Sequence, residues 1–337
     1  MSSSRMPISA DSEIDLDHAD DRRTVSRVEP AHGGHSGPAK PLLRRAFAKL
    51  YWAFMRSLPH NRVGDRIFSC VRFATFQKRL PKNALLYNDV IYRIKTSNEI
   101  LDPLRVFVTD KEFVKIFVKA VAGDRYNIPT IAVLRSLEDV DSFEFPADCC
   151  IKPTHASGRV IFRRNGEPVD REKIKSWFDV NYYLSGREVN YKYLAPKIIV
   201  EPFVFGRTNV EDYKIFCVDG VPKLIQVDVD RHIEHKRKYF DAHWNEQPFS
   251  IKYPRADKVV PKPHNFSEML DVAAKLSRYF WFVRIDLYSD GRQLFVGEIT
   301  HCPDNAGGVF DPPAAEAIVS HYLFSGCSAE QARGWRP

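Results

Sequence analysis

Two acidic residues near the C-terminal end of the chain, Asp286 and Glu298, each lie in a short apolar segment with the composition of a β-strand. The segments cover residues 282–288 and 294–300, and the five residues between them are all polar. We therefore expect a hairpin. If both carboxylates point to the same face of it, they form a hard-oxygen site of the kind that binds Mg²⁺.

The register of this hairpin decides whether the two acids share a face. With a five-residue loop, Tyr288 faces Val296 and Asp286 lies opposite Glu298. A two-residue turn at Asp290–Gly291 would instead send the two acids to opposite faces. The sequence leaves both registers open, and the alternative to a metal site is an exposed strand face with alternating charges.

A lysine that ends an apolar segment is the second candidate. Lys152 closes the predicted strand 148–152 and is followed by Pro-Thr-His-Ala-Ser-Gly. A loop of small residues ending in Ser157 and Gly158 can bring its backbone amides close to phosphate groups, while the lysine supplies a positive charge. His155 lies in this loop and could donate to the same ligand. The alternative is a surface lysine before an ordinary turn.

Two further patterns are weak when taken singly. The apolar segment 198–203 contains Glu201-Pro-Phe and could present backbone groups to the edge of an adenine. Asp110 and Lys111 open a helix that we predict over residues 111–121. By themselves, the first pattern is a strand that ends and the second is a solvated basic helix face.

In their order along the chain, these four patterns resemble the catalytic region of the ATP-grasp superfamily. That region has Asp-Lys at a helix start, a lysine on a strand, an acidic residue at the adenine hinge, and then Arg-x-Asp and Glu-x-Asn. One branch, the TupA-like ATP-grasp family of teichuronopeptide and other bacterial surface-polysaccharide biosynthesis, is more closely similar. This similarity lies in V-T-D-K, I-K-P-T-H-A-S-G, I-I-V-E-P-F, E-D-Y-K-I-F-C-V-D-G, F-V-R-I-D-L-Y and F-V-G-E-I-T. It covers about residues 105–313.

The resemblance implies a role around one bound ATP for each motif residue. It assigns phosphates to Lys111 and Lys152, adenine to Glu201, Phe203 and Val204, ribose or phosphates to Asp212 and Lys214, catalysis to Arg284 and Lys152, and Mg²⁺ to Asp286 and Glu298.

One position departs from the superfamily pattern. Asn usually stands two residues after the metal-binding glutamate, and here Thr300 stands there. The third metal ligand is therefore open, with His301, Asp304 and Asn305 as nearby candidates.

The implied fold is α+β, with two lobes whose antiparallel sheets clasp ATP, preceded by a variable N-terminal region. The implied reaction activates a carboxylate as an acyl phosphate, using ATP and Mg²⁺, and couples it to an amine. The acceptor would be acidic, or a polysaccharide or peptide precursor. A phosphotransferase acting on a hydroxyl acceptor is the alternative, and a non-catalytic basic module for nucleic acid or membrane ranks below both.

Composition divides the chain into four parts. Residues 1–40 are polar and predict a disordered tail, because they hold too little apolar surface to offset the entropy of ordering. We expect a helical and mixed region over 41–104, the catalytic region over 105–313 with lobe boundaries near 150 and 205, and a C-terminal helix and tail over 314–337. The chain has a net charge of +7 but no dense Lys/Arg block interleaved with aromatics, so we expect no nucleic-acid partner.

A basic amphipathic helix is predicted over residues 41–56. It either packs on the folded body or makes a peripheral membrane contact. No run approaches the ~18 apolar residues of a spanning helix, and the six cysteines lack CxxC spacing. We expect a cytoplasmic protein, with the inner face of the membrane as an alternative place.

The segment 231–241, with His232 and His235, is the candidate for acceptor recognition.

Overall fold

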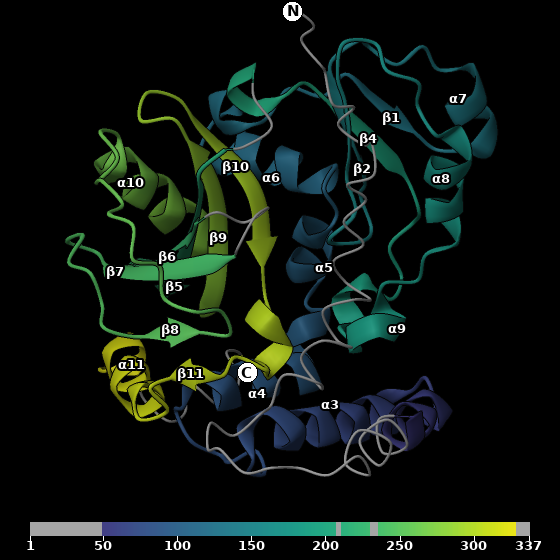
Figure 1. Cartoon of the computed structure of the whole chain (residues 1–337). Coiled ribbons are helices and arrows are strands. Elements are labelled where there is room, and N and C mark those ends of the chain that lie inside the picture. Colours follow the sequence, from purple (N-terminus) through teal and green to yellow (C-terminus); the bar gives the residue numbers. More distant parts are fainter. Residues whose placement is uncertain (1–48, 207–209, 230–234, 328–337) are drawn as a thin grey trace, which may run out of the picture.

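The computed structural model describes residues 49–206, 210–229 and 235–327. The predicted tail over 1–40, the start of the 41–56 helix and His232 lie outside the described residues. Two antiparallel sheets face each other across the centre of the molecule (Figure 1), and helices pack on the outer side of each. The mixture of helices and antiparallel sheets confirms the predicted α+β class.

The smaller sheet has four strands in the order β1-β4-β2-β3. The strands are β1 (Ala132–Leu134), β2 (Cys149–Pro153), β3 (Ile161–Arg163) and β4 (Ile198–Glu201). Two short helices, α7 (Leu137–Ser142) and α8 (Arg171–Ser176), lie on its outer side (Figure 1). Val140, Ile151, Ile174 and Val200 are fully buried between sheet and helices, so this lobe has a core of its own.

The larger sheet has five strands in the order β10-β9-β5-β6-β7. Its strands are β5 (Asp212–Val218), β6 (Val221–Val229), β7 (Lys236–Asp241), β9 (Phe282–Ser289) and β10 (Leu294–Thr300). The apolar face packs against α5 (Pro103–Thr109), α6 (Phe113–Val121) and α10 (Phe266–Ser277). The opposite face carries polar side chains toward the small sheet.

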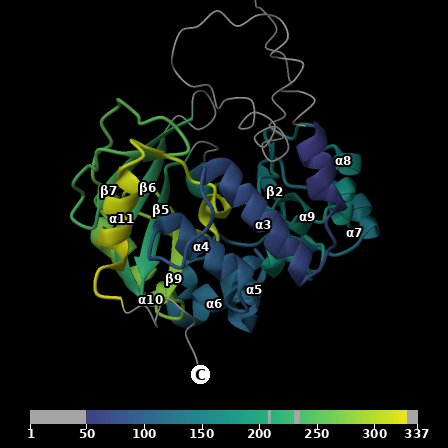
Figure 2. The same ribbon diagram turned by 90° about the horizontal axis from the view of Figure 1, so that it is seen from below.

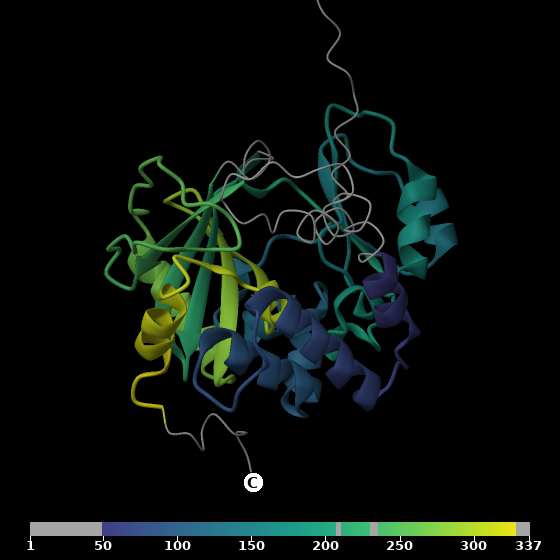
Figure 3. The ribbon, with the colours of Figure 1, turned by 60° about the horizontal axis from the view of Figure 1, so that its bottom comes forward.

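The base of the molecule is built from the N-terminal and C-terminal helices (Figures 2 and 3). They are a helix over residues 49–57, α3 (Arg62–Gln77), α4 (Tyr87–Thr96) and α11 (Ala315–Phe324). Together with the strand pair β8 (Ser250–Ile251) and β11 (Phe310–Asp311), α4 and α11 bury the lower end of the polar face. The short helix α9 (Tyr183–Gly186) links α3 to the body, because Tyr183 and Arg187 both bond Asp65.

Most predicted elements are confirmed to within two residues. Asp219–Gly220 between two apolar segments predicts a hairpin turn, and the structure has it: both residues have positive φ (48° and 75°), as a tight two-residue turn requires. The sequence Ser-Glu-Met-Leu from Ser267 onward predicts a helix capped by that serine. This prediction is wrong: Asn265 precedes α10 and Ser267 lies inside it, because buried Phe266 is already helical.

The hairpin of β9 and β10 places Asp286 opposite Glu298 and Arg284 opposite Thr300, as predicted from the five-residue loop. Closer to the loop, however, Tyr288 faces Phe295 rather than Val296. A β-bulge at Gly297 accounts for the difference, because it inserts one extra residue and shifts the register between the two ends of the hairpin. Without the bulge, Asp286 and Glu298 would not be partners.

Gly297 is required by close packing. A Cβ at this position would lie 2.7 Å from Cε2 of Tyr288, so a side chain must displace either the ring or the bulge. We expect Gly297→Ala to lower the free energy of unfolding by about 1–3 kcal/mol, which thermal unfolding would measure as a loss of several degrees in Tm. Combining it with Tyr288→Leu should recover part of the loss. Unchanged stability of Gly297→Ala would contradict the packing argument.

Candidate active site

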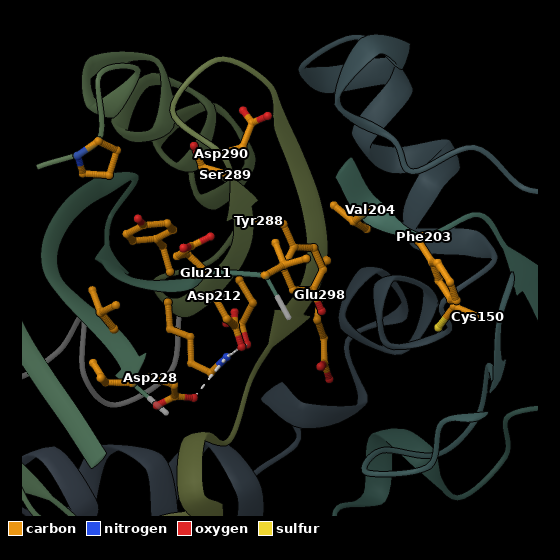
Figure 4. A pocket seen from close by; sticks show the side chains of 18 of the residues that line it. Cys150, Phe203, Val204, Glu211, Asp212, Asp228, Tyr288, Ser289, Asp290 and Glu298 are labelled. Carbon is orange, nitrogen blue, oxygen red and sulfur yellow. Dashed lines mark hydrogen bonds and ion pairs between the residues drawn. The ribbon is translucent and has the colours of Figure 1, made fainter. Parts of the chain in front are cut away.

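A cleft of about 750 Å³ lies between the two sheets. This is a volume typical of small-molecule and cofactor sites. The small lobe contributes β2, the loop after it and the end of β4, and the large lobe contributes β5, β6, β9, β10 and the loop 258–264. Figure 4 shows Phe203, Val204 and Cys150 on one side and Asp212, Asp228 and Glu298 on the other.

A buried three-residue ion cluster lies at the small-lobe wall. Glu201 is 3% exposed, and its two carboxylate oxygens lie 2.5 Å from Lys152 Nζ and 2.5 Å from Lys115 Nζ. Burial opposes ionisation of Glu201, but the two ammonium groups outweigh it and hold its pKa below the usual value. Burial likewise lowers the pKa of Lys152, and the Glu201 charge reverses this and raises it. The predicted adenine-binding carboxylate is therefore already neutralised by two lysines.

The Asp-Lys motif connects the start of α6 to the phosphate-loop candidate. Asp110 Oδ1 accepts from the amide of Glu112 (2.8 Å), and its Oδ2 accepts from the Thr154 hydroxyl (3.1 Å). Lys111 Nζ then donates to the carbonyl of Ala156 (2.5 Å). Burial lowers the pKa of Lys111, while the nearby Glu298 charge opposes the shift. Lys111 thus lines the cleft together with Ser157 and Gly158.

The large sheet presents a row of charges on its polar face. Arg284 forms a bidentate pair with Asp286, with both N–O distances 2.7 Å, and also donates to Thr300 Oγ1 (3.2 Å). Lys214 lies in the middle of three carboxylates: it bonds Asp212 and is 3.4 Å from Asp286 and 3.6 Å from Asp228. Because these residues come from β5, β6 and β9, the row crosses three adjacent strands.

Glu298 completes this row on β10. The Tyr191 hydroxyl lies 3.4 Å from its Oε1, and Lys111, just before α6, is near enough to interact with its charge. The residue in the usual asparagine position, Thr300, is engaged by Arg284. Among the described residues, no group of three or more His, Cys, Asp or Glu is arranged to hold a metal ion alone.

His155 is the predicted site residue that the structure places away from the cleft. Its ring is buried, Nε2 lies 3.1 Å from the carbonyl of Trp177, and Nδ1 accepts from the amide of Lys197 (3.3 Å). Both ring nitrogens are thus occupied in holding the loop. The ring does not line the cleft, contrary to the prediction that His155 donates to the ligand.

Sequence reasoning missed Lys115 and Asp228 as site residues. Lys115 lies on the helix over 111–121, whose basic face the sequence predicts to be solvated, but its Nζ contacts the Glu201 carboxylate. Asp228 is buried beside Lys214 and Arg237 and accepts from Gln226. Burial opposes its ionisation, but the two cations hold its pKa well below the usual value.

The acceptor-recognition candidate is described only from His235 onward. His235 Nε2 lies 3.2 Å from Asp228, and the ring stacks on Tyr253 at 3.8 Å. Arg237, its neighbour on β7, bonds Asp228 and lies 3.3 Å from Asp304. Asp228, which lines the cleft, is therefore paired with His235 and Arg237 beside it.

The family model described as TupA-like ATPgrasp matches residues 91–321. The chain belongs to the TupA-like ATP-grasp family. The match extends beyond the 105–313 that the motifs indicated, and it includes both sheets, the helices α5, α6 and α10, and most of α11.

Solved ATP-grasp structures are similar to this TupA-like chain at low sequence identity. D-alanine–D-alanine ligase from Helicobacter pylori is 15% identical (TM-score 0.36), with 69% of this chain and 62% of that chain covered. The enzyme from Bacillus anthracis complexed with ATP is 13% identical (0.36; 68% and 68%). L-amino acid ligase from Bacillus licheniformis is 12% identical (0.39; 78% and 63%). This chain thus spans less than two thirds of the Helicobacter and licheniformis enzymes. A search of the curated proteins finds no match.

The Glu201 cluster predicts a pH-dependent difference between wild type and Glu201→Gln. The folded-state pKa of Glu201 lies below its ordinary value of 4.5, so its contribution to stability is present above that pH. The contribution is lost as the pH falls through the lower folded-state pKa. We expect Glu201→Gln to cost about 3 kcal/mol near neutral pH, since it removes the buried negative charge that two half-buried lysines share. The difference should shrink below pH ~4.5.

Denaturant unfolding at a series of pH values would measure this difference. Glu246→Gln is the matched control, because Glu246 also contacts two cations, Lys238 and Arg255, but its side chain is 32% exposed. Its loss should stay below about 1 kcal/mol. Equal losses in the two variants would contradict the cluster's importance.

Proposed function

We propose that this TupA-like ATP-grasp protein is a Mg²⁺-dependent, ADP-forming ligase that activates a carboxylate with ATP and couples it to an amine. One observation carries the proposal. Lys111 before α6 and Lys152 of the small lobe line the same cleft as Arg284, Asp286 and Glu298 of the large sheet. A nucleoside triphosphate needs cations for its phosphates and carboxylates for its metal, and the cleft offers both.

The nucleoside end of the ligand fits the hinge after β4. Phe203 and Val204 line the cleft there together with Cys150 of β2, and Tyr288 of β9 lines the large-lobe side. These side chains provide apolar walls for an adenine, and the backbone of residues 202–204 is the polar edge between them. Glu201 supports this end indirectly, through Lys115 and Lys152.

The metal-binding roles fit Asp286 and Glu298. Mg²⁺ in nucleotide sites is held by one or two carboxylates and takes its other ligands from phosphates and water. Two carboxylates on adjacent strands satisfy that requirement without an asparagine at position 300. When bound, the ion would neutralise phosphate charge.

The reaction balances without a covalent intermediate on the protein. A substrate carboxylate oxygen attacks the γ-phosphorus, the bond to the bridging oxygen breaks, and ADP leaves. An amine then attacks the acyl phosphate carbon, phosphate leaves with the bonding electrons, and the amine nitrogen loses a proton to water. Lys111, Lys152 and Arg284 position the phosphates and offset the developing negative charge.

The family suggests an acidic, polysaccharide-linked or peptide substrate in surface-polymer or teichuronopeptide-like biosynthesis inside the cell. A hydroxyl acceptor would make the same site a phosphotransferase. Hydroxylamine separates the two, because it traps an acyl phosphate as a hydroxamate and leaves a phosphate ester intact. Hydroxamate formed from a carboxylate substrate would support ligation. An acid-stable phosphorylated product without hydroxamate would favour the phosphotransferase.

The two carboxylates give a direct prediction. Asp286→Asn and Glu298→Gln should each lower Mg²⁺-dependent ATP turnover by at least ~100-fold, since each removes charge from the metal site. Circular dichroism should show an intact fold. Asp271→Asn on α10 is the matched control and should keep wild-type turnover, because Asp271 is exposed, pairs with Lys275 along its own helix and does not line the cleft. Wild-type turnover in both site variants would refute the metal assignment.

A further inference from the structure

The positive charge of this protein is concentrated in one stretch of the chain. Residues 42–86 contain a single acidic residue, Asp65, and a net charge of +9, whereas the whole chain carries +7. The ten cations of this stretch are Arg44, Arg45, Lys49, Arg56, Arg62, Arg66, Arg72, Lys78, Arg79 and Lys82. The rest of the chain is therefore close to neutral. The net charge of the whole chain indicates no partner, but its distribution along the chain singles out residues 42–86, of which 42–48 lie outside the described residues.

The described part of this stretch forms two helices at the base of the molecule. Figure 2 shows α3 on the underside, with the helix of residues 49–57 beside its beginning. Met55 and Leu58 are buried against Phe68 of α3, so the two helices form one packed unit. The prediction that the basic helix packs on the body is thus confirmed for residues 49–57.

The inner side of α3 is firmly attached to the body. Asp65 is buried and pairs with Arg187 at 2.9 Å, and Arg187 also donates to the carbonyls of Leu58 and Pro59. The only acid of the stretch is therefore turned inward and neutralised. The charged side chains on the solvent side of the unit are therefore all cationic.

That solvent side also exposes large apolar side chains. Leu50 is 70% exposed, Phe54 46%, Val63 64% and Ile67 40%. On α3, Arg62 lies one turn before Arg66, and Val63 lies one turn before Ile67. The four side chains therefore share one stripe of the helix. We call the set Leu50, Phe54, Arg62, Val63, Arg66 and Ile67 the basal face.

We propose that the basal face docks the protein on an anionic membrane surface. Arginines attract the negatively charged headgroups, and the exposed Leu, Phe, Val and Ile side chains enter the boundary between headgroups and acyl chains. Both kinds of side chain are needed for such a surface. A nucleic acid would use the cations but would gain little from four exposed apolar side chains, three of them aliphatic.

The contact is peripheral. No helix in the described part of the chain is long and apolar enough to cross a membrane. The docking does not depend on the reaction at the cleft, because none of the six residues of the basal face lines that cleft.

Co-sedimentation of the full chain with lipid vesicles tests the proposal. The wild type should bind vesicles of about one third phosphatidylglycerol in phosphatidylcholine, and should stay in solution with phosphatidylcholine alone. Raising the salt to about 1 M, where the Debye length is about 3 Å, should weaken the binding. Wild-type protein that stays in solution with the anionic vesicles would overturn the proposal.

Two double variants separate the charge from the apolar contribution. Arg62→Glu with Arg66→Glu should weaken vesicle partitioning about 30-fold or more, from roughly fivefold for each cation lost. Leu50→Ser with Phe54→Ser should weaken it about tenfold or more. Arg278→Glu with Arg292→Glu makes the same charge change at exposed positions of the large lobe and should bind as the wild type does.

A short duplex DNA distinguishes a membrane surface from a general polyanion site. The charge variant could lose binding to DNA and vesicles alike while the Leu50 and Phe54 variant binds both as the wild type does. In that case the basal face binds any polyanion through its charge alone, and the membrane proposal fails. Thermal unfolding of each variant, with wild-type midpoints expected because all four side chains are exposed, shows that any loss does not come from misfolding.

Discussion

The site depends on an electrostatic constraint within one face of the large sheet. Asp212, Asp228, Asp286 and Glu298 come from four adjacent strands and point to the same side, where unscreened carboxylates would repel one another. Lys214 lies among the three aspartates of this row. Arg284 forms a bidentate pair with Asp286, and Arg237 bonds Asp228. The row is stable because cations are interleaved with the acids. It also concentrates charge where a metal-bound triphosphate would be handled.

Two β-bulges bring these charges into line. The bulge at Gly297 aligns Glu298 with Asp286, and a second register shift next to Cys217 aligns Asp228 with Asp212. A regular ladder would turn half of these carboxylates toward the apolar core, because a one-residue slip exchanges the two faces of a strand. Irregular pairing is thus what allows neighbouring strands to contribute to a single polar face.

This explains what the sequence could predict and what it could not. The strands, the Asp219–Gly220 turn and the order of the motifs follow from local composition, and the pairing of Asp286 with Glu298 followed from the assumed loop. The bulge that produces this pairing has no local signal, so Tyr288 was placed opposite the wrong residue. For the same reason Asp228 was missed: a regular hairpin at Gly220 puts Val227, not Asp228, opposite Asp212. The contacts of His155 and Lys115 depend on how the loop after β2 and α6 pack in three dimensions, and the order of the motifs carries no information about that packing.

Across the cleft from this row, Glu201 holds Lys152, and the loop bonded to Asp110 holds Lys111. We propose that one Mg²⁺-ATP binds between these lysines and the row of charges. Isothermal titration calorimetry with a non-hydrolysable ATP analogue, with and without Mg²⁺, tests this claim most directly on wild type and Lys152→Ala. We expect one site per chain, tighter with Mg²⁺, and an affinity at least ~10-fold weaker in the variant. Absence of binding to the wild type under both conditions would contradict the account.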